Sequence, residues 1–315
     1  MINGLKKSML LACVTLVYAD TTSLVLENDA LVGKDHHYTN GVYFTWMGEN
    51  DTTSFDVLPF IDLPQKNVAL SFSHAIFTPE DKKRKTKNLD DLPYAGYMGI
   101  NLLAYKSSEH FFHEAGVNVG MVGPSTQAEG IQKGFHSLIG HSKPKGWEYQ
   151  LNDEVMYGAS YQVGYKTAPV SLGDMSFDVS TNVRGDVGTF YTGALVGGAL
   201  RLSSVPMKSF VTMGNYIGAN ESLLLHHEAP KSFQWALSLG AFYNGVESYY
   251  LIDEAIDKGY RLKKMNAIVG EKVSLDFFYD EIQLSFYLKS VDIDYKGGRS
   301  SNEKTGGMNL VWKWN

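Results

Sequence analysis

Residues 67–77 have the sequence NVALSFSHAIF, in which apolar residues alternate with polar or small ones. Alternation with a period of two is typical of a β-strand with one apolar face. About ten residues is also the length that a tilted strand needs to cross a bilayer. The same period recurs along the whole chain, at 42–46, 98–105, 114–122, 157–165, 176–187, 235–242 and 308–314. We therefore predict an all-β protein of amphipathic antiparallel strands.

The connections between these segments alternate in length. Tight turns occur at 107–108, at 168–169 and around 279–280, whereas long polar loops cover 29–38, 78–93 and 123–152. Outer-membrane barrels have short turns at one end and long loops at the other. We therefore predict one closed transmembrane β-barrel over residues 20–315. It has about twelve strands if 233–252 is one long strand, and about fourteen if that stretch splits and 208–217 is also a strand.

A soluble sandwich or a lipocalin-like barrel would show similar alternation and similar turns. Three features favour the membrane barrel instead: the length of the strands, the abundance of Tyr (19) and Phe (16), and an export signal. No stretch after the amino terminus has about eighteen consecutive apolar residues, so no transmembrane helix is expected. The net charge of -6 argues against binding to nucleic acid.

The amino terminus resembles a secretory signal peptide. Lys6 and Lys7 precede a short apolar run over 8–17, and residues 17–19 (VYA) fit a cleavage site. We predict that residues 1–19 are removed, which leaves a mature chain without cysteine. The alternative is a lipoprotein signal, in which residues 10–13 (LLAC) would make Cys13 a lipidated amino terminus.

Strand direction predicts that three polar clusters meet at one end of the barrel. A first strand from about Thr22 ends at Asn28-Asp29, a third ends before the basic run 82–87, and a fifth ends before the loop around His136. Because neighbouring antiparallel strands alternate in direction, odd-numbered strands all end on the same side. If the first strand starts in the periplasm, this end faces the exterior of the cell.

The loop around His136 has helical spacing from 128 to 140. Ile131, Phe135, Leu138 and Ile139 would share an apolar face, and Gln132 and His136 would lie on a neighbouring polar face, with Glu129 close by. Without further knowledge, His136 would be taken for an ordinary surface histidine, and Asn28-Asp29 would equally fit a turn that starts a loop.

Several stretches occur in a particular order along the chain. They are Glu27-Asn28-Asp29, Tyr38-Thr39-Asn40-Gly41, Ile76-Phe77-Thr78-Pro79, Lys83-Arg84-Lys85, and Gly123-Pro124-Ser125 followed by Gln132, His136, Gly140 and Trp147. In this order they resemble the outer-membrane lipid A 3′-O-deacylase family, and the resemblance covers nearly the whole mature chain. It implies a twelve-stranded barrel with a short helix in an extracellular loop. It also implies hydrolysis of the ester that holds the acyloxyacyl chain at the 3′ position of lipid A, with Ca²⁺ as cofactor.

By motif match, the resemblance assigns site residues. The catalytic set is His136, Asn28, Asp29, Thr39 and Gln132, and Lys83 also falls on an active-site position. From the chemistry of the side chains, we expect Asn28 and Asp29 as calcium ligands, and Lys83 and Arg84 as contacts to the substrate. Such chemistry is coherent, because histidine accepts protons near neutral pH and Ca²⁺ prefers oxygen ligands. The chain departs from the family at Ala30-Leu31, where some members have further acidic residues.

Lipid A in lipopolysaccharide and the surrounding outer-membrane lipids are therefore the expected partners, and we expect a monomer. The basic run would face lipid phosphates, which arginine binds through two hydrogen bonds, although solvated charged loops are common.

Two other functions stay open: an esterase that acts on phospholipids, and a porin or receptor barrel without catalysis. No Gly-x-Ser-x-Gly motif is present. Three local histidine groups, which lack companion carboxylates, are interpreted as loop or turn residues: His36, His37, His110, His113, His226 and His227.

Overall fold

The computed structural model describes residues 21–29, 37–49, 61–214, 230–293, 295–296 and 302–314. The predicted signal peptide (1–19), Cys13, His36, His226 and His227 lie outside these residues.

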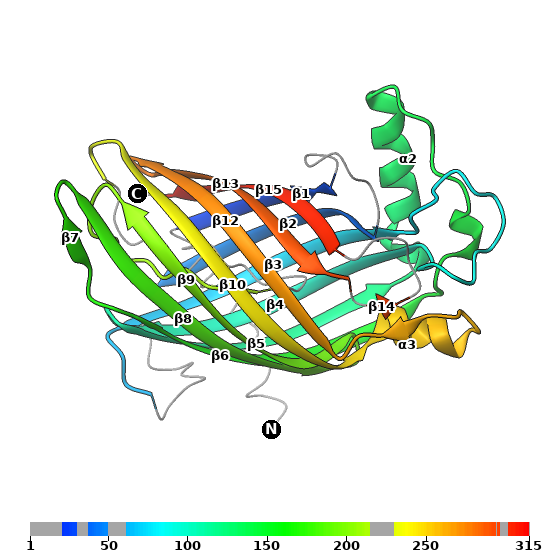
Figure 1. Ribbon diagram of the computed structural model, residues 1–315, viewed down its shortest axis with the longest axis horizontal. Helices are drawn as coiled ribbons and strands as arrows, with labels where there is room; N and C mark the ends of the chain where they lie inside the picture. The colour runs from blue at the N-terminus through cyan, green and yellow to red at the C-terminus, as the bar shows by residue number, and fades with distance from the viewer. Residues whose placement is uncertain are drawn as a thin grey trace, which may run out of the picture.

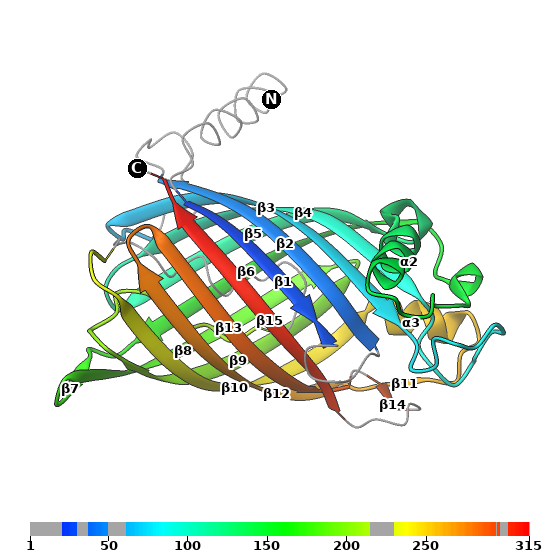
Figure 2. The same ribbon diagram turned by 90° about the horizontal axis from the view of Figure 1, so that it is seen from above.

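Twelve long antiparallel strands of the described chain form a closed barrel (Figures 1 and 2). They are β1 (Thr21–Asn28), β2 (His37–Glu49), β3 (Gln65–Thr78), β4 (Ala95–Ser107), β5 (Phe111–Val122), β6 (Glu154–Lys166), β8 (Met175–Gly188), β9 (Tyr191–Ser203), β10 (Gln234–Tyr249), β12 (Ala267–Tyr279), β13 (Ile282–Asp292) and β15 (Asn302–Lys313). Each strand pairs with its neighbours in chain order, and β1 pairs with β15 to close the ring. The predicted twelve-stranded barrel is confirmed, and all the predicted strand segments lie in strands, apart from Trp314, just after β15.

Three shorter strands complete the sheets. β7 (Val170–Leu172) pairs with the start of β8, and β11 (Lys263–Lys264) pairs with β14 (Tyr295–Lys296) in a separate two-stranded ladder.

The period-2 alternation sorts side chains between the inside and the outside of the wall. In β6, Met156 and Lys166 face the interior and are almost fully buried, whereas Val155, Tyr157 and Tyr161 face outward and are 43–63% exposed. The outer surface of the wall is thus apolar and aromatic, as a surface in contact with lipid must be. No helix among the described residues is long and apolar enough to span a bilayer.

The two ends of the barrel differ. At the turn end, where β1 begins and β15 ends, short turns connect β4 to β5 and β12 to β13. At the opposite end, called here the loop end, the chain forms η4 (Pro124–Thr126), α2 (Ala128–Leu138), η5 (Trp147–Tyr149) and α3 (Tyr250–Asp257). Figure 1 shows α2 and α3 together at this end. The helix predicted over 128–140 is therefore present.

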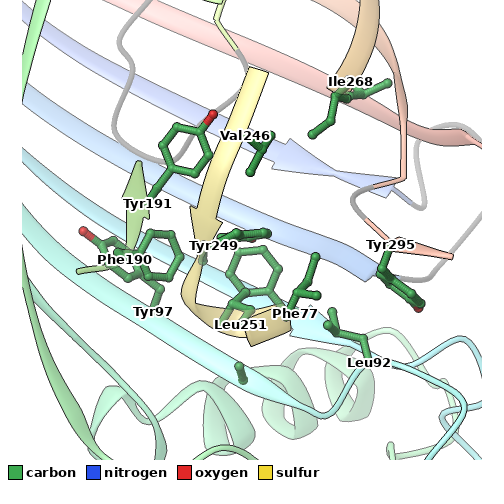
Figure 3. Close-up of a cluster of buried hydrophobic side chains, with 14 of the residues drawn as sticks. Phe77, Leu92, Tyr97, Phe190, Tyr191, Val246, Tyr249, Leu251, Ile268 and Tyr295 are labelled. Atoms are coloured by element: carbon green, nitrogen blue, oxygen red, sulfur yellow. The ribbon is translucent and has the colours of Figure 1, made fainter. Parts of the chain in front are cut away.

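Large side chains fill the half of the lumen next to the loop end. Figure 3 shows rings from different parts of the barrel in contact. Phe190, in the turn between β8 and β9, lies 4.6 Å from Tyr97 of β4 and 5.5 Å from Tyr249 of β10, measured between ring centroids. Leu251 of α3 and Tyr295 of β14 belong to the same buried cluster. Residues 233–252 are thus not one long strand, because β10 ends at Tyr249 and α3 covers the mouth of the barrel.

Residues 205–214 fill the other half of the lumen. The fourteen-stranded alternative placed a strand at 208–217, which is wrong for its described part, 208–214. This segment instead enters the barrel from the turn end, where polar side chains of the wall bind its carbonyl groups. Lys166 Nζ donates to Met207 O at 2.5 Å, Arg201 Nη2 to Ser209 O at 2.8 Å, and Asn182 Nδ2 to Met213 O at 2.8 Å.

We predict that the barrel does not conduct ions. Protein reconstituted into a planar lipid bilayer should give no steady current steps, because the buried cluster and residues 205–214 fill both halves of the lumen. A porin inserted into the same bilayer is the positive control. Regular open-channel steps from the folded protein would contradict this prediction and would favour the porin function.

Candidate active site

At the loop end, the last residues of β1 and the first residues of β2 carry polar side chains on the outer face of the wall. Asn28 follows the outward positions of β1 and lies opposite Asn40 of β2. The pairing of β2 with β3 is shifted between Tyr38 and Asn40, which makes Thr39 the extra residue of a β-bulge. A bulge reverses the inside–outside order of the residues beyond it.

The bulge turns Tyr38 inward and Thr39 outward. Tyr38 OH donates to Glu27 Oε2 at 2.5 Å inside the barrel. Thr39 Oγ1 lies 2.7 Å from Thr78 Oγ1, which belongs to an outward position of β3. Both threonines are buried, at 5% and 0% exposure, although they belong to the outer face. Some other part of the chain must therefore cover this face.

The loop between β5 and β6 covers the neighbouring positions of this face. Ile76 of β3 forms a buried cluster with Ala128 of α2 and Trp147 of η5, and His74 Nε2 lies 3.0 Å from Thr126 O. A Cβ atom added to Gly96 of β4 would lie 2.5 Å from the Ala128 side chain, so only glycine allows this close approach. The start of α2 is thus fixed against the outside of the wall.

Gln132 occupies the buried side of α2, at 4% exposure. Its Oε1 accepts a hydrogen bond from Trp147 Nε1 at 2.9 Å. Because the indole N–H only donates, this bond fixes the orientation of the amide. The Nε2 group of Gln132 is buried and has no hydrogen-bond partner among the described residues. A buried amide donor left unpaired costs about 1–3 kcal/mol unless water or a ligand completes it.

His136 lies one turn after Gln132 and is half-buried. Its Nδ1 lies 2.8 Å from the carbonyl oxygen of Ser142. A carbonyl only accepts, so Nδ1 carries the proton and the lone pair is on Nε2. The imidazole is therefore oriented with Nε2 as a proton acceptor.

Asp29 follows the last residue of β1 and is buried at 1% exposure. The nearby cation is Lys82, from the loop between β3 and β4. Burial lowers the pKa of the Lys82 ammonium to about 8, and attraction to the Asp29 carboxylate opposes this shift. The Lys82 carbonyl also accepts a hydrogen bond from Lys145 N at 2.8 Å, in the chain that returns from α2. The three loops that carry Asp29, Lys82 and His136 are thus joined at the loop end.

The Asn28 and Asp29 side chains suit a calcium ion in chemistry, because both offer oxygen atoms. Asp29 is a buried carboxylate that already attracts a cation. No group of three or more His, Cys, Asp or Glu side chains that would hold a metal lies among the described residues. A calcium ion here would therefore need carbonyl, water or substrate oxygen atoms in addition to Asn28 and Asp29.

The two predicted substrate contacts, Lys83 and Arg84, have exposed side chains at the loop end. Arg84 Nε donates to Thr86 Oγ1 at 3.2 Å. The sequence did not single out Lys82 or Thr78 as site residues. Thr78 was present in a matching stretch, but no sequence signal separates Lys82 from the other residues of the basic run.

Two of the described histidines were wrongly expected in loops or turns. His37 is the first residue of β2 and is buried, with Nε2 2.9 Å from Tyr295 OH, and His113 lies within β5. His110 lies in the turn between β4 and β5.

Comparison with known proteins agrees with this architecture. LpxR from Salmonella typhimurium has a solved structure that superposes with a TM-score of 0.76 at 15% identity, covering 93% of this chain and 100% of that one. The β domain of the Bordetella autotransporter BrkA matches with a TM-score of 0.44 at 9% identity, covering 93% of this chain and 97% of that one. No curated protein sequence matches significantly. The family model described as "Outer membrane protein LpxR" matches residues 7–314, and the chain therefore belongs to this family of outer-membrane proteins.

Proposed function

We propose that this protein is a lipid A 3′-O-deacylase that acts as a monomer in the Gram-negative outer membrane. It would hydrolyse the ester that links the acyloxyacyl chain to the 3′ position of lipid A. Membership of the LpxR family supports this function. The observation that carries it is the buried Gln132 amide, which has a fixed orientation and an unused donor, on the same helix as His136.

The position of these groups suits a substrate within the membrane. Asn28, Thr39 and Gln132 belong to the outside of the wall or to its cover, so a lipid would reach them without entering the lumen. We infer that the loop end faces the exterior of the cell, where lipid A forms the outer leaflet. The exposed Lys83 and Arg84 would bind its phosphates.

His136 is proposed as the general base. Its Nε2 takes a proton from water while the water oxygen bonds to the ester carbonyl carbon. The tetrahedral intermediate then expels the sugar oxygen, which takes the proton back from Nε2, and the acyl group leaves as a carboxylic acid. The hydrogen bond from Nδ1 to Ser142 O keeps the imidazole in the tautomer that this step needs.

The negative oxygen of the intermediate needs donors. Gln132 Nε2 supplies one, because Trp147 holds the other end of the amide. Thr39 would position water or the substrate carbonyl. Calcium bound by the oxygen atoms of Asn28 and Asp29 would polarise the ester carbonyl.

We predict that expression in a Gram-negative host removes one acyloxyacyl group from its lipid A. Mass spectrometry of extracted lipid A should show the corresponding loss of mass with the native protein. The His136→Ala variant should leave lipid A intact, because the water would lack its base. Heat-modifiable gel migration should show that the variant still folds.

An unchanged lipid A spectrum, with folded native protein and added calcium, would contradict the proposal. Release of fatty acid from phospholipids alone would favour the phospholipase-like esterase. Full turnover by His136→Ala would show that His136 is not the general base.

We predict that Gln132→Glu lowers kcat by about 100-fold, because an oxygen replaces the amide donor. Trp147→Phe should lower kcat less, since the amide stays but loses the bond that orients it. The matched control is Gln127→Glu, which makes the same change at an exposed position just before α2. Equal activity of Gln132→Glu and Gln127→Glu would show that the buried amide does not act in the reaction.

We predict that a calcium chelator abolishes the activity and that added Ca²⁺ restores it. Terbium luminescence in detergent should show binding to the native protein and loss of binding in Asp29→Asn, because a carboxylate ligand is removed. The matched control is Asp174→Asn, in an exposed turn at the opposite end of the barrel. Terbium binding that survives in Asp29→Asn would exclude Asp29 as a ligand.

A further inference from the structure

One flank of α2 carries apolar side chains that are exposed. Leu138 is 83% exposed, Ile131 and Phe135 are each 49% exposed, and Ile139, just after the helix, is 46% exposed. Ala128 and Gln132 form the buried side instead. Exposed apolar residues that gather in one patch usually mark a surface for lipid or another protein.

The helix lies in an orientation that suits the surface of a membrane. Figure 1 shows α2 running across the long axis of the barrel, and Figure 2 shows it from near its end. Strands cross the bilayer roughly along the barrel axis. A helix that runs across this axis therefore lies in the plane of the membrane.

The polar flank of α2, opposite the apolar one, faces away from the barrel. On a helical wheel, Glu129, Lys133 and His136 lie on the other side of Gln132 from Ile131 and Phe135. His136 bonds to Ser142, and Figure 1 shows the chain after α2 returning on the side of the helix that is away from the strands. The apolar flank therefore faces back along the outer surface of the barrel.

That surface is the lipid-facing wall. β5 leads directly into the loop of α2, and β6 follows it. Both strands expose apolar side chains on the outside, with Val117 56%, Val119 54%, Val155 62% and Tyr157 63% exposed. In an outer-membrane protein these side chains contact hydrocarbon. α2 itself packs against β3 and β4, whose outward Phe72 and Ile100 are 37% and 49% exposed on the same lipid-facing wall.

We infer that α2 is an interfacial helix, whose flank of Ile131, Phe135, Leu138 and Ile139 inserts into the hydrocarbon of the outer leaflet. Its polar flank stays at the level of the head groups, as in other amphipathic helices at membranes. Because Gln132 and His136 belong to the same rigid helix, its insertion sets their depth relative to the lipid. The inference requires outer-membrane residence and does not require the proposed hydrolysis.

The test compares two neighbouring positions of α2. Leu138→Cys and Ser137→Cys are each combined with Cys13→Ser, labelled with the fluorophore NBD, and folded into phosphatidylcholine vesicles. A second set of vesicles contains phosphatidylcholine with a nitroxide near the top of its acyl chain, which quenches NBD in the shallow hydrocarbon. Val155→Cys is the positive control on the wall, and heat-modifiable migration reports folding of each variant.

The label at position 138 should fluoresce at shorter wavelength than the label at 137, with at least about threefold stronger quenching by the nitroxide lipid. Equal quenching at 137 and 138, with strong quenching at 155, would overturn the inference. A label at 138 that is shielded from the nitroxide, with a cross-linked dimer of the same variant, would also overturn it, because a second copy would then cover the flank.

Discussion

Lipid offers no hydrogen bonds, so every N–H and C=O group of the wall must find its partner within the sheet. The chain meets this requirement by pairing β1 with β15, residue by residue from Thr21 with Lys313 to Asn28 with Gly306. Closure brings the two ends of the described chain together and fixes which residues lie at each end of the barrel. Asn28 therefore lies toward the loop end, because β1 starts at the turn end and Asn28 is its last residue. The position of every polar cluster follows from this ring.

Regular alternation places mostly apolar side chains on the outer face of the ring, although Asn28 and Thr78 also face outward at the loop end. The bulge in β2 adds Thr39 to these polar groups, because it sends Thr39 outward and Tyr38 inward at the same step. The hydrogen bond from Tyr38 to Glu27 holds the inward side chain, and the contact of Thr39 with Thr78 holds the outward one. One extra residue in β2 thus places a hydroxyl group on the outside of the wall, next to Asn40.

Much of this architecture can be predicted from the sequence, since alternation reports which face of a strand is apolar and strand direction reports which end a loop occupies. These two rules placed Asp29 and His136 at the same end, where the structure has them. They do not give the bulge, which depends on the register between β2 and β3. They also missed α3. The path of residues 205–214 could not be predicted, because a segment that fills a lumen has no period of its own. Lys82 is the residue of the basic run that interacts with Asp29, and this too depends on tertiary packing.

Polar groups on the outside of a membrane barrel would be unstable if they faced hydrocarbon directly. The loop from Gly123 to Asp153 solves part of this problem by laying the start of α2 and η5 over Ile76 of β3 and Gly96 of β4. Thr39 and Thr78, close to Ile76 in the wall, are buried rather than exposed to lipid. The same cover buries the Gln132 amide beside Trp147, while the apolar flank of α2 stays exposed. In the proposed reaction, the substrate would approach this covered site from the lipid beside the wall, without entering the lumen.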